Sequence, residues 1–465
     1  MKKKHNFIIL SGGSGSRLWP SSRPSLPKQF IGFREGTTLF GDTIKRVDAN
    51  QGTQLTVVSN KAHNFLCRRE LSKLGKGASL ILEEVGRNTA PAILMAAFNA
   101  SEDDMLVIMP ADHWIEDSRV FGKIIQTASE VASSEDCWVT LGIEPTEPQT
   151  GYGYIKATGE GKKRAVESFT EKPDLKTAKR YMTESNYYWN SGIFVVSTQK
   201  CVESFKQHQP ELYEAGKECW ENRDIYEDEI ILRKTRLDKI PSISVDYAIL
   251  EKETNIAMIP FEGHWSDVGS WDSLFKLIET DQSDGSYSNN SVQIDTKNTF
   301  IYSSARTIAA VGVEDLIIVD DDNATLVVQK GKSEKVKDAL EMLKALNIPA
   351  AREHSFEYRP WGLFENLLDS PICKVKRLTV NPGHHLSLQY HHKRSEHWVI
   401  VQGRATVQLE DETLYMESGQ SIDIPLGVKH SLGNDTGEDV IVIEVQMGSY
   451  FGEDDIVRVS DPYNR

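Results

Sequence analysis

A short apolar run that opens into a glycine-rich loop constrains the fold of this chain more than any other feature. Residues 7–10 are all apolar, which is typical of a strand buried on both faces of a parallel sheet. Gly12, Gly13 and Gly15 follow directly, and a loop without Cβ atoms leaves backbone N–H groups free to surround a polyphosphate. The sequence therefore predicts an α/β sheet with a nucleotide site at the end of its first strand.

The residues after the loop add the charge that a triphosphate needs. Arg17 and Lys28 are cationic, and Ser16 lies between the last glycine and Arg17. A P-loop would need a Lys-Ser or Lys-Thr pair after the glycines, and a dinucleotide fingerprint would need a third glycine where Leu18 stands. The alternative of an ordinary strand-to-helix turn is disfavoured by the two cations and by Pro27.

The motif resembles the signature of the sugar-nucleotide pyrophosphorylases, a GG-x-G-x-RL loop followed by a Pro-Lys pair. Its longer form here, with residues 18–20 and 28–30, is similar to that of the bacterial mannose-1-phosphate guanylyltransferases. The resemblance implies that Arg17 and Lys28 are catalytic and that the loop binds GTP through Gly12, Gly13, Gly15 and Ser16.

Alternating strand and helix patterns predict a Rossmann-like first domain with a mostly parallel sheet over residues 1–283. Strands are expected at 55–59, 80–83, 105–109 and 138–142, and helices at 61–74, 89–100 and 118–133. In such sheets ligands bind at the carboxyl ends of the strands. The 465 residues leave room for one or two further domains.

Two smaller β regions are expected after the first domain. Residues 284–350 contain short runs rich in Val, Ile, Thr, Asn and Asp and then a charged helix at 334–346, which predicts a short β-helix-like segment and a linker. Residues 351–465 alternate strands with turns, which predicts an antiparallel β-barrel. Seven of the twelve histidines lie after residue 350, so a metal site is expected in this last domain.

Composition limits the partners and the compartment. The formal net charge is −15, so nucleic acid and anionic membrane surfaces are not expected partners, and anionic substrates must be held by local basic groups. The five cysteines form no C-x-x-C pair, and no apolar run reaches the roughly 20 residues of a membrane helix. A cytoplasmic location is expected, and a homo-oligomer is left open.

Two aspartates are candidate Mg²⁺ ligands. Asp112 follows the expected strand at 105–109, and Asp267 lies in the segment 265–271. A carboxylate beside a phosphate loop suits Mg²⁺, which takes oxygen ligands and bridges phosphates. Each aspartate alone could be a helix cap or a turn residue. Together with the loop they fit the two metal-binding aspartates that the family resemblance implies.

Further motifs match the same family at the expected sugar and nucleotide sites. The resemblance implies that Lys172 binds the phosphate of the sugar 1-phosphate and acts in catalysis, and it places the sugar near Gly153, Glu171, Asn190, Gly192 and Asp246. The stretch 84–92 matches the guanylyltransferases and implies nucleotide contacts from Arg87, Asn88 and Thr89. Asn88 or Thr89 could instead serve only as helix caps. The preference for guanine depends on the resemblance alone.

Two spaced motifs in the last domain match those of the cupins. The first gives Gln389, His391 and Glu396 as metal ligands, with Gln389 in place of the usual first histidine, and the second gives His430. Gln389 and His391 are two positions apart and so face one side of a strand. Nitrogen and oxygen donors of this kind suit Zn²⁺, with Fe²⁺, Mn²⁺ or Co²⁺ as alternatives.

Residues 389–398 also resemble the Q-x-H-x-x-R-x-E-H-W motif of type II phosphomannose isomerase. The whole chain is therefore similar to the bifunctional mannose-1-phosphate guanylyltransferase/mannose-6-phosphate isomerase family. That resemblance implies GDP-mannose synthesis from GTP and mannose 1-phosphate, and a second activity on mannose 6-phosphate in which Arg394 binds substrate or steadies the enediolate. Ser431 and Lys393 depart from the common pattern without removing a ligand.

Three alternatives stay open at this point. The cupin could serve structure or assembly alone, leaving a single-function transferase. The first domain could use another nucleotide or another hexose 1-phosphate. The chain could also be a regulatory sensor that binds GDP-mannose without turnover, although Arg17, Lys28, Asp112 and Asp267 argue against it.

Overall fold

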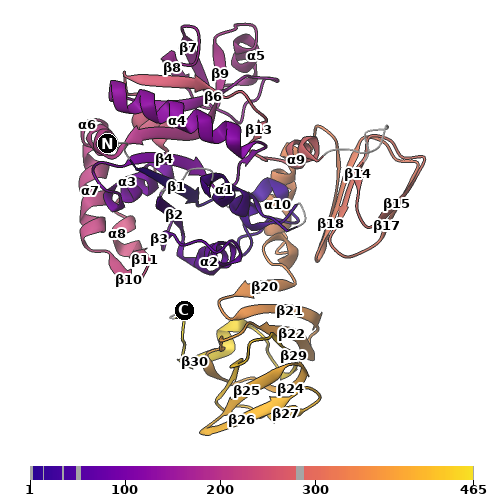
Figure 1. The fold of residues 1–465 in the computed structure, drawn as a ribbon. Helices are drawn as coiled ribbons and strands as arrows, with labels where there is room; N and C mark the ends of the chain where they lie inside the picture. Colours follow the sequence, from indigo (N-terminus) through magenta and orange to yellow (C-terminus); the bar gives the residue numbers. More distant parts are fainter. Residues whose placement is uncertain (1–3, 14, 34–35, 49–53, 279–286, 464–465) are drawn as a thin grey trace.

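The computed structural model describes residues 4–463 apart from residue 14 and the segments 34–35, 49–53 and 279–286. Figure 1 shows a large α/β part formed by the N-terminal half, a narrow stack of strands beside it, and an all-β part at the C-terminal end. The expected boundary at 283/284 lies outside the described residues. The boundary at 350/351 falls inside a short 3-10 helix, Pro349–Ala351.

An eleven-stranded sheet forms the α/β part. Its strands in spatial order are β10 (Asp224–Tyr226), β11 (Glu229–Leu232), β3 (Ser79–Glu83), β2 (Gln54–Asn60), β1 (His5–Ser11), β4 (Met105–Pro110), β9 (Tyr187–Ser197), β6 (Trp138–Ile143), β12 (Ile256–Pro260), β8 (Arg164–Thr170) and β7 (Tyr154–Thr158). The run from β11 to β4 is parallel, as are β6 and β12. The expected strands agree with β2, β3, β4 and β6 to within one residue at each end.

Helices cover both faces of this sheet because its central strands are apolar on both sides. Phe7 and Ile9 of β1 lie in one core with residues of α1 (Leu39–Asp48), α2 (Asn64–Lys73) and α4 (Ser118–Glu135). Ile8 faces the opposite core, which includes residues of α3 (Thr89–Asn99), α6 (Thr198–His208) and α7 (Pro210–Glu221). Shorter helices are α5 (Leu175–Tyr181), α8 (Lys234–Leu237) and α9 (Trp271–Leu277).

The sheet departs from a purely parallel one at β9, which runs antiparallel between β4 and β6. β7 and β8 extend the far edge as an antiparallel pair. A second small ladder matters for the site: β5 (Trp114–Ile115) pairs antiparallel with β13 (Trp265–Ser266), Ser266 lying opposite Trp114. This ladder brings the segment after Asp112 beside the segment before Asp267.

The narrow stack is a short parallel β-helix, as its composition predicted. β14 (Tyr287–Ser288), β16 (Phe300–Ser303) and β18 (Leu316–Asp321) pair in parallel, as do β15 (Ser291–Ile294) and β17 (Ile308–Val311), and β19 (Ala324–Gln329) closes the stack in the antiparallel sense. The helix α10 (Val336–Ala345) follows, and its Leu340 shares a core with Leu18, next to the glycine-rich loop.

The C-terminal part is a cupin-like barrel of two antiparallel sheets. One sheet has the order β20 (Phe356–Arg359), β21 (Gly362–Asp369), β22 (Cys373–Val380), β29 (Val440–Gly448), β24 (Arg394–Gln402) and β27 (Ser421–Ile424). The other has the order β26 (Glu412–Glu417), β25 (Arg404–Leu409), β28 (His430–Gly433), β23 (Leu388–His391) and β30 (Ile456–Ser460). Trp398, Ile400 and Val442 lie in the core of this part.

The barrel and the linker before it are held against the first domain by specific contacts. The indole N–H of Trp19 donates to the Ala350 carbonyl at 2.9 Å, and the guanidinium of Arg69 lies 3.8 Å from the centre of the Tyr358 ring.

In the part of the chain that the structure describes, no helix has both the length and the apolar character to cross a bilayer.

Candidate active sites

The glycine-rich loop follows β1 at the carboxyl end of the sheet. Gly12 and Gly13 are exposed, and a Cβ on either would meet no described atom within 4 Å. Gly15 adopts a φ of +63°, and a Cβ there would collide with the side chain of Lys28. The first two glycines therefore leave the backbone open to a ligand, whereas the third allows Lys28 to pack against the loop. Ser16 begins the short 3-10 helix Ser16–Leu18 that follows.

Lys28 connects the two aspartates that were expected to bind Mg²⁺. Its ammonium lies 2.7 Å from Oδ2 of Asp112 and donates to the backbone carbonyl of Asp267 at 2.6 Å. The lysine side chain is only 6% exposed. Burial alone would raise the pKa of Asp112, but the charges of Lys28 and His113 hold that pKa below its ordinary value. Asp112 is therefore an ionised carboxylate.

Asp267 is not the cap of helix α9. The cap of α9 is Ser270, whose hydroxyl accepts from the Ser273 N–H. Asp267 Oδ1 instead accepts from the Tyr152 hydroxyl at 2.6 Å and from the Gly269 N–H at 2.9 Å. Burial and the Asp267 charge raise the pKa of Tyr152, so the phenol stays protonated and acts as a donor.

Arg17 has a partner from the segment that follows the β-helix. Its Nη1 lies 3.0 Å from both carboxylate oxygens of Glu334, and the arginine side chain is 39% exposed. Because the two residues are far apart in the chain, no local pattern could predict this pair. A triphosphate bound at the loop would compete with Glu334 for the guanidinium.

The residues expected to bind the sugar lie together at the same edge of the sheet as the glycine-rich loop, but apart from that loop. Lys172 Nζ lies 2.7 Å from Glu171 Oε1, and Asn190 Nδ2 donates to Asp246 Oδ1 at 3.0 Å. A Cβ on Gly153 would lie 2.6 Å from Glu171 Oε2, so this glycine makes room for that carboxylate.

Burial and neighbouring charges shift the pKa values of two groups in this cluster. Burial and the neighbouring Glu171 raise the pKa of Asp246 to about 6. Burial lowers the pKa of Lys172, but its ion pair with Glu171 outweighs this and leaves that pKa raised. Gly192 has a φ of +70° and approaches Pro110 at the end of β4, which places this cluster beside the aspartates.

The three residues expected to bind the nucleotide, Arg87, Asn88 and Thr89, make contacts within the chain. Asn88 is the N-cap of α3, accepting from the Thr89 N–H at 2.8 Å. Thr89 accepts from the Val245 N–H at 2.9 Å, and Arg87 donates to the Ile240 carbonyl at 2.8 Å. These contacts tie the stretch to the segment that carries Asp246. Direct nucleotide contact by these residues stays a prediction.

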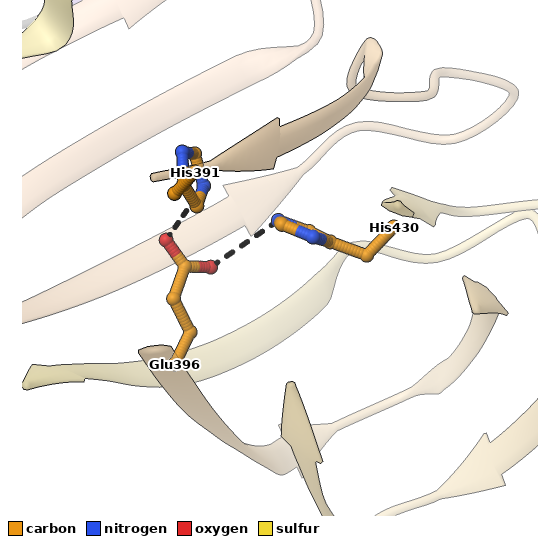
Figure 2. Close-up of side chains that lie close together, drawn as sticks. All are labelled: His391, Glu396 and His430. Carbon is orange, nitrogen blue, oxygen red and sulfur yellow. Dashed lines mark ion pairs between the residues drawn. The ribbon is translucent and has the colours of Figure 1, made fainter. Parts of the chain in front are cut away.

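The cupin motifs converge inside the barrel, as Figure 2 shows. Glu396 Oε1 lies 3.0 Å from His391 Nε2, and Glu396 Oε2 lies 3.5 Å from His430 Nε2. The ligand atoms of the three residues all lie within 4.8 Å of one another, and each side chain is at most 2% exposed. Gln389 lies opposite His430 in the ladder between β23 and β28.

The donor set fits a divalent metal. Both ring nitrogens of His391 and Nε2 of His430 are buried without a hydrogen-bond partner among the described residues, although both rings lie at ion-pairing distance from Glu396. Buried polar atoms left in this way are costly unless something else satisfies them. Burial would raise the pKa of Glu396, but the two imidazoles hold it well below its ordinary value. Two imidazoles and a carboxylate are ligands that Zn²⁺ takes.

Neighbouring residues orient this cluster. Arg394 Nε donates to Glu396 Oε1 at 3.3 Å, and its Nη1 donates to the Gly452 carbonyl at 3.0 Å. Gln446 also donates to Glu396 Oε1, at 3.1 Å, and to Glu444 at 3.0 Å. Burial and the Glu396 charge raise the pKa of Glu444.

Glu444 and Gln446 were not among the predicted site residues, although a signal was present. In β29 the buried positions alternate as Val440, Val442, Glu444 and Gln446, so two polar residues occupy the face that the period of two assigns to the core. Polar groups on such a face need partners.

Comparisons with known proteins agree with this architecture. Family models match three successive segments: "Nucleotidyl transferase" at residues 6–284, "MannoseP isomerase/GMP-like beta-helix domain" at 289–343 and "Mannose-6-phosphate isomerase C-terminal" at 347–461. The xanthan biosynthesis protein XanB of Xanthomonas campestris pv. campestris (strain B100) is 42% identical over 98% of both chains. A mannose-1-phosphate guanylyltransferase of Klebsiella pneumoniae is 37% identical, over 98% of this chain and 99% of the relative.

A solved structure extends the likeness to three dimensions. A protein of Thermus thermophilus, described as a mannose-1-phosphate geranyltransferase, has a TM-score of 0.64 and 29% identity, covering 73% of this chain and 99% of its own. Since the match to the curated relatives runs end to end and includes both enzymatic domains, the chain belongs to the bifunctional mannose-1-phosphate guanylyltransferase/mannose-6-phosphate isomerase family.

Proposed function

We propose that this chain transfers GMP from GTP to α-D-mannose 1-phosphate, giving GDP-mannose and pyrophosphate, and that its barrel interconverts mannose 6-phosphate and fructose 6-phosphate. The observation that carries the first activity is the position of Lys28, which joins Asp112 to Asp267 beside an open glycine loop. Full-length relatives named for guanylyl transfer support the same function.

The transfer needs no covalent enzyme intermediate. A phosphate oxygen of mannose 1-phosphate attacks the α-phosphorus of GTP in line, and the bond from that phosphorus to the bridging oxygen breaks as pyrophosphate leaves. The chain's task is then to position both substrates and to offset developing negative charge. Backbone N–H groups at Gly12 and Gly13, with Arg17 and Lys28, are suited to the triphosphate.

The second substrate lies at the cluster beside the aspartates in this proposal. Lys172 binds the phosphate of mannose 1-phosphate, and Glu171, Asn190 and Asp246 accept or donate hydrogen bonds to sugar hydroxyls. Mg²⁺ held by Asp112 and Asp267 would neutralise phosphate charge and fix phosphate geometry. The Lys28 ammonium, which also contacts Asp112, keeps that carboxylate ionised and in place.

In the barrel we assign Gln389, His391, Glu396 and His430 to a divalent metal, Zn²⁺ or, alternatively, Co²⁺, Mn²⁺ or Fe²⁺. The metal would polarise the sugar oxygens at C1 and C2 so that a proton can move between these carbons. Arg394 holds Glu396 in place and lines the pocket that opens beside it. A cytoplasmic location is part of this proposal.

The test of the transferase measures GDP-mannose and pyrophosphate formation by the full chain with GTP and mannose 1-phosphate. UTP, ATP and glucose 1-phosphate are offered in competition. Release of pyrophosphate with GTP and mannose 1-phosphate as the favoured pair supports the proposal. If another pair of nucleotide and sugar phosphate is preferred, the chain is a pyrophosphorylase for that pair. If it binds GDP-mannose tightly without releasing pyrophosphate, the chain is a sensor.

A further inference from the structure

The pocket beside the candidate metal centre has two chemically different ends. Its lining crosses the inner face of the six-stranded sheet, from Glu396 on β24 through Gln446 on β29 to Lys376 on β22 and Arg359 on β20. Because neighbouring strands lie about 4.8 Å apart, Lys376 and Glu396 start from strands roughly 10 Å apart. A six-carbon sugar phosphate can bridge such a distance.

The end away from the metal centre is cationic, and its lysine is buried. Lys376 Nζ lies 4.8 Å from the centre of the Phe364 ring, and the guanidinium carbon of Arg359 lies 5.3 Å from the same ring. The Lys376 side chain is 7% exposed. A lysine is rarely buried to this extent unless an anion accompanies it.

A carboxylate of the chain itself lies between these two cations. Glu453 Oε1 is 3.3 Å from Lys376 Nζ, and Glu453 Oε2 is 3.6 Å from Arg359 Nη2. Glu453 begins the short 3-10 helix Glu453–Asp455, and its side chain is 50% exposed. Its two oxygens therefore contact the cations as two oxygens of a phosphate would.

The charge of the pocket lining also favours an anionic ligand. Four cationic side chains line it, whereas only three carboxylates do, namely those of Glu396, Glu444 and Glu453. The cations are Arg359, Lys376, Arg394 and Arg458. This excess exists within a chain whose formal net charge is −15, so it is a local feature of the pocket.

We propose that Lys376 and Arg359 bind the phosphate group of a hexose 6-phosphate whose C1 and C2 oxygens lie at the metal centre, and that Glu453 is the internal counter-ion that this phosphate displaces. The assignment rests on the proposed isomerase function for the identity of the sugar. It adds the residues that select a phosphorylated sugar over a neutral one.

The test measures binding of mannose 6-phosphate and of unphosphorylated mannose to the full chain by calorimetry, with and without Zn²⁺. Lys376→Gln and Arg359→Gln are each expected to weaken mannose 6-phosphate binding roughly 10- to 100-fold, the range for hydrogen bonds to charged groups. Glu453→Gln is expected to strengthen it, because the competing carboxylate charge is gone. Arg377→Gln, on the outward face of the same strand as Lys376, is the matched control and should change nothing.

The opposite signs separate a binding role from general damage to the barrel. Equal losses for mannose and mannose 6-phosphate, no loss in either cation variant, or no binding of mannose 6-phosphate by the wild-type chain would each overturn the assignment. Charge-dependent binding without formation of fructose 6-phosphate would support it, while refuting the isomerase activity.

Discussion

The two candidate active sites are built in opposite ways. The transferase site lies on loops at the carboxyl end of a sheet, and its cations already have carboxylate partners: Arg17 with Glu334, Lys28 with Asp112, and Lys172 with Glu171. The barrel site lies on strands between two sheets, and three of its four imidazole nitrogens, both of His391 and Nε2 of His430, are buried without a hydrogen-bond partner among the described residues.

The difference shows what each site requires from its ligand. In the transferase site an arriving phosphate or Mg²⁺ exchanges places with charges that the chain supplies, so binding rearranges ion pairs. In the barrel the donors are already gathered around Glu396, and a metal would bind imidazole nitrogens that have no hydrogen-bond partner among the described residues. Substitutions should therefore act on the two activities independently.

The largest effect is expected from Lys28→Ala. This variant removes the group that joins Asp112 and Asp267, so GDP-mannose formation should fall roughly 10²- to 10³-fold, as for loss of one preorganised donor in an active site. Initial rates with GTP and mannose 1-phosphate measure this. Lys45→Ala, which removes an exposed lysine on α1, should leave the rate unchanged, and a normal rate in Lys28→Ala would contradict the site assignment.

Zn²⁺ should stabilise the barrel and leave the first domain unaffected. At a free concentration of 100 Kd the expected gain in the free energy of unfolding is about 2.7 kcal/mol. Thermal unfolding of the full chain with Zn²⁺ and then with EDTA would reveal the shift. In His391→Ala the shift should disappear; an undiminished shift there would place the metal elsewhere.

Arg17→Ala should weaken GTP binding roughly ten- to a hundredfold through loss of charge-assisted hydrogen bonds to phosphate. Glu334→Gln is the informative partner, because it removes the ion pair but keeps the arginine. An exposed ion pair of this kind contributes little to stability, so the KM for GTP in Glu334→Gln should stay the same or fall slightly. If both variants lose GTP binding equally, the function of Arg17 is to hold Glu334.

The smallest effect is a pH dependence at the sugar end. The pKa of Asp246 is about 6, so the carboxyl is ionised above that pH and protonated below it. The ionised form is the better acceptor for sugar hydroxyls, and the KM for mannose 1-phosphate should rise a few-fold as the pH falls from about 7 to about 5. Asp246→Asn should remove the part of this pH dependence of KM that comes from Asp246 and leave the part that comes from titration of the substrate phosphate. An identical pH dependence of KM in the variant would exclude Asp246 as its source.

The fold could be predicted well where periodicity decides it. Apolar runs located β2, β3, β4 and β6, and the period of two predicted a shared face for Gln389 and His391, which lie two positions apart on β23. The antiparallel insertion of β9 could not be predicted in this way, because a buried strand has the same apolar pattern in either direction.

The two sites also differ in how much of each could be predicted from the sequence. The cupin donors lie on three strands, β23, β24 and β28, and the resemblance to the two cupin motifs is what brought them together in the sequence. Two of the transferase cations have partners from distant segments that only the tertiary fold joins: Glu334 for Arg17 and the carbonyl of Asp267 for Lys28. Glu453, the counter-ion between Lys376 and Arg359, is a further example.

The most direct test of two active sites in one chain is formation of fructose 6-phosphate from mannose 6-phosphate, with Zn²⁺, Co²⁺ or Mn²⁺ added in turn. Metal-dependent turnover that is lost in His391→Ala, while that variant still makes GDP-mannose at the wild-type rate, is the predicted result. No turnover with any of these metals, in protein that makes GDP-mannose, would contradict the account and leave a transferase with a structural barrel.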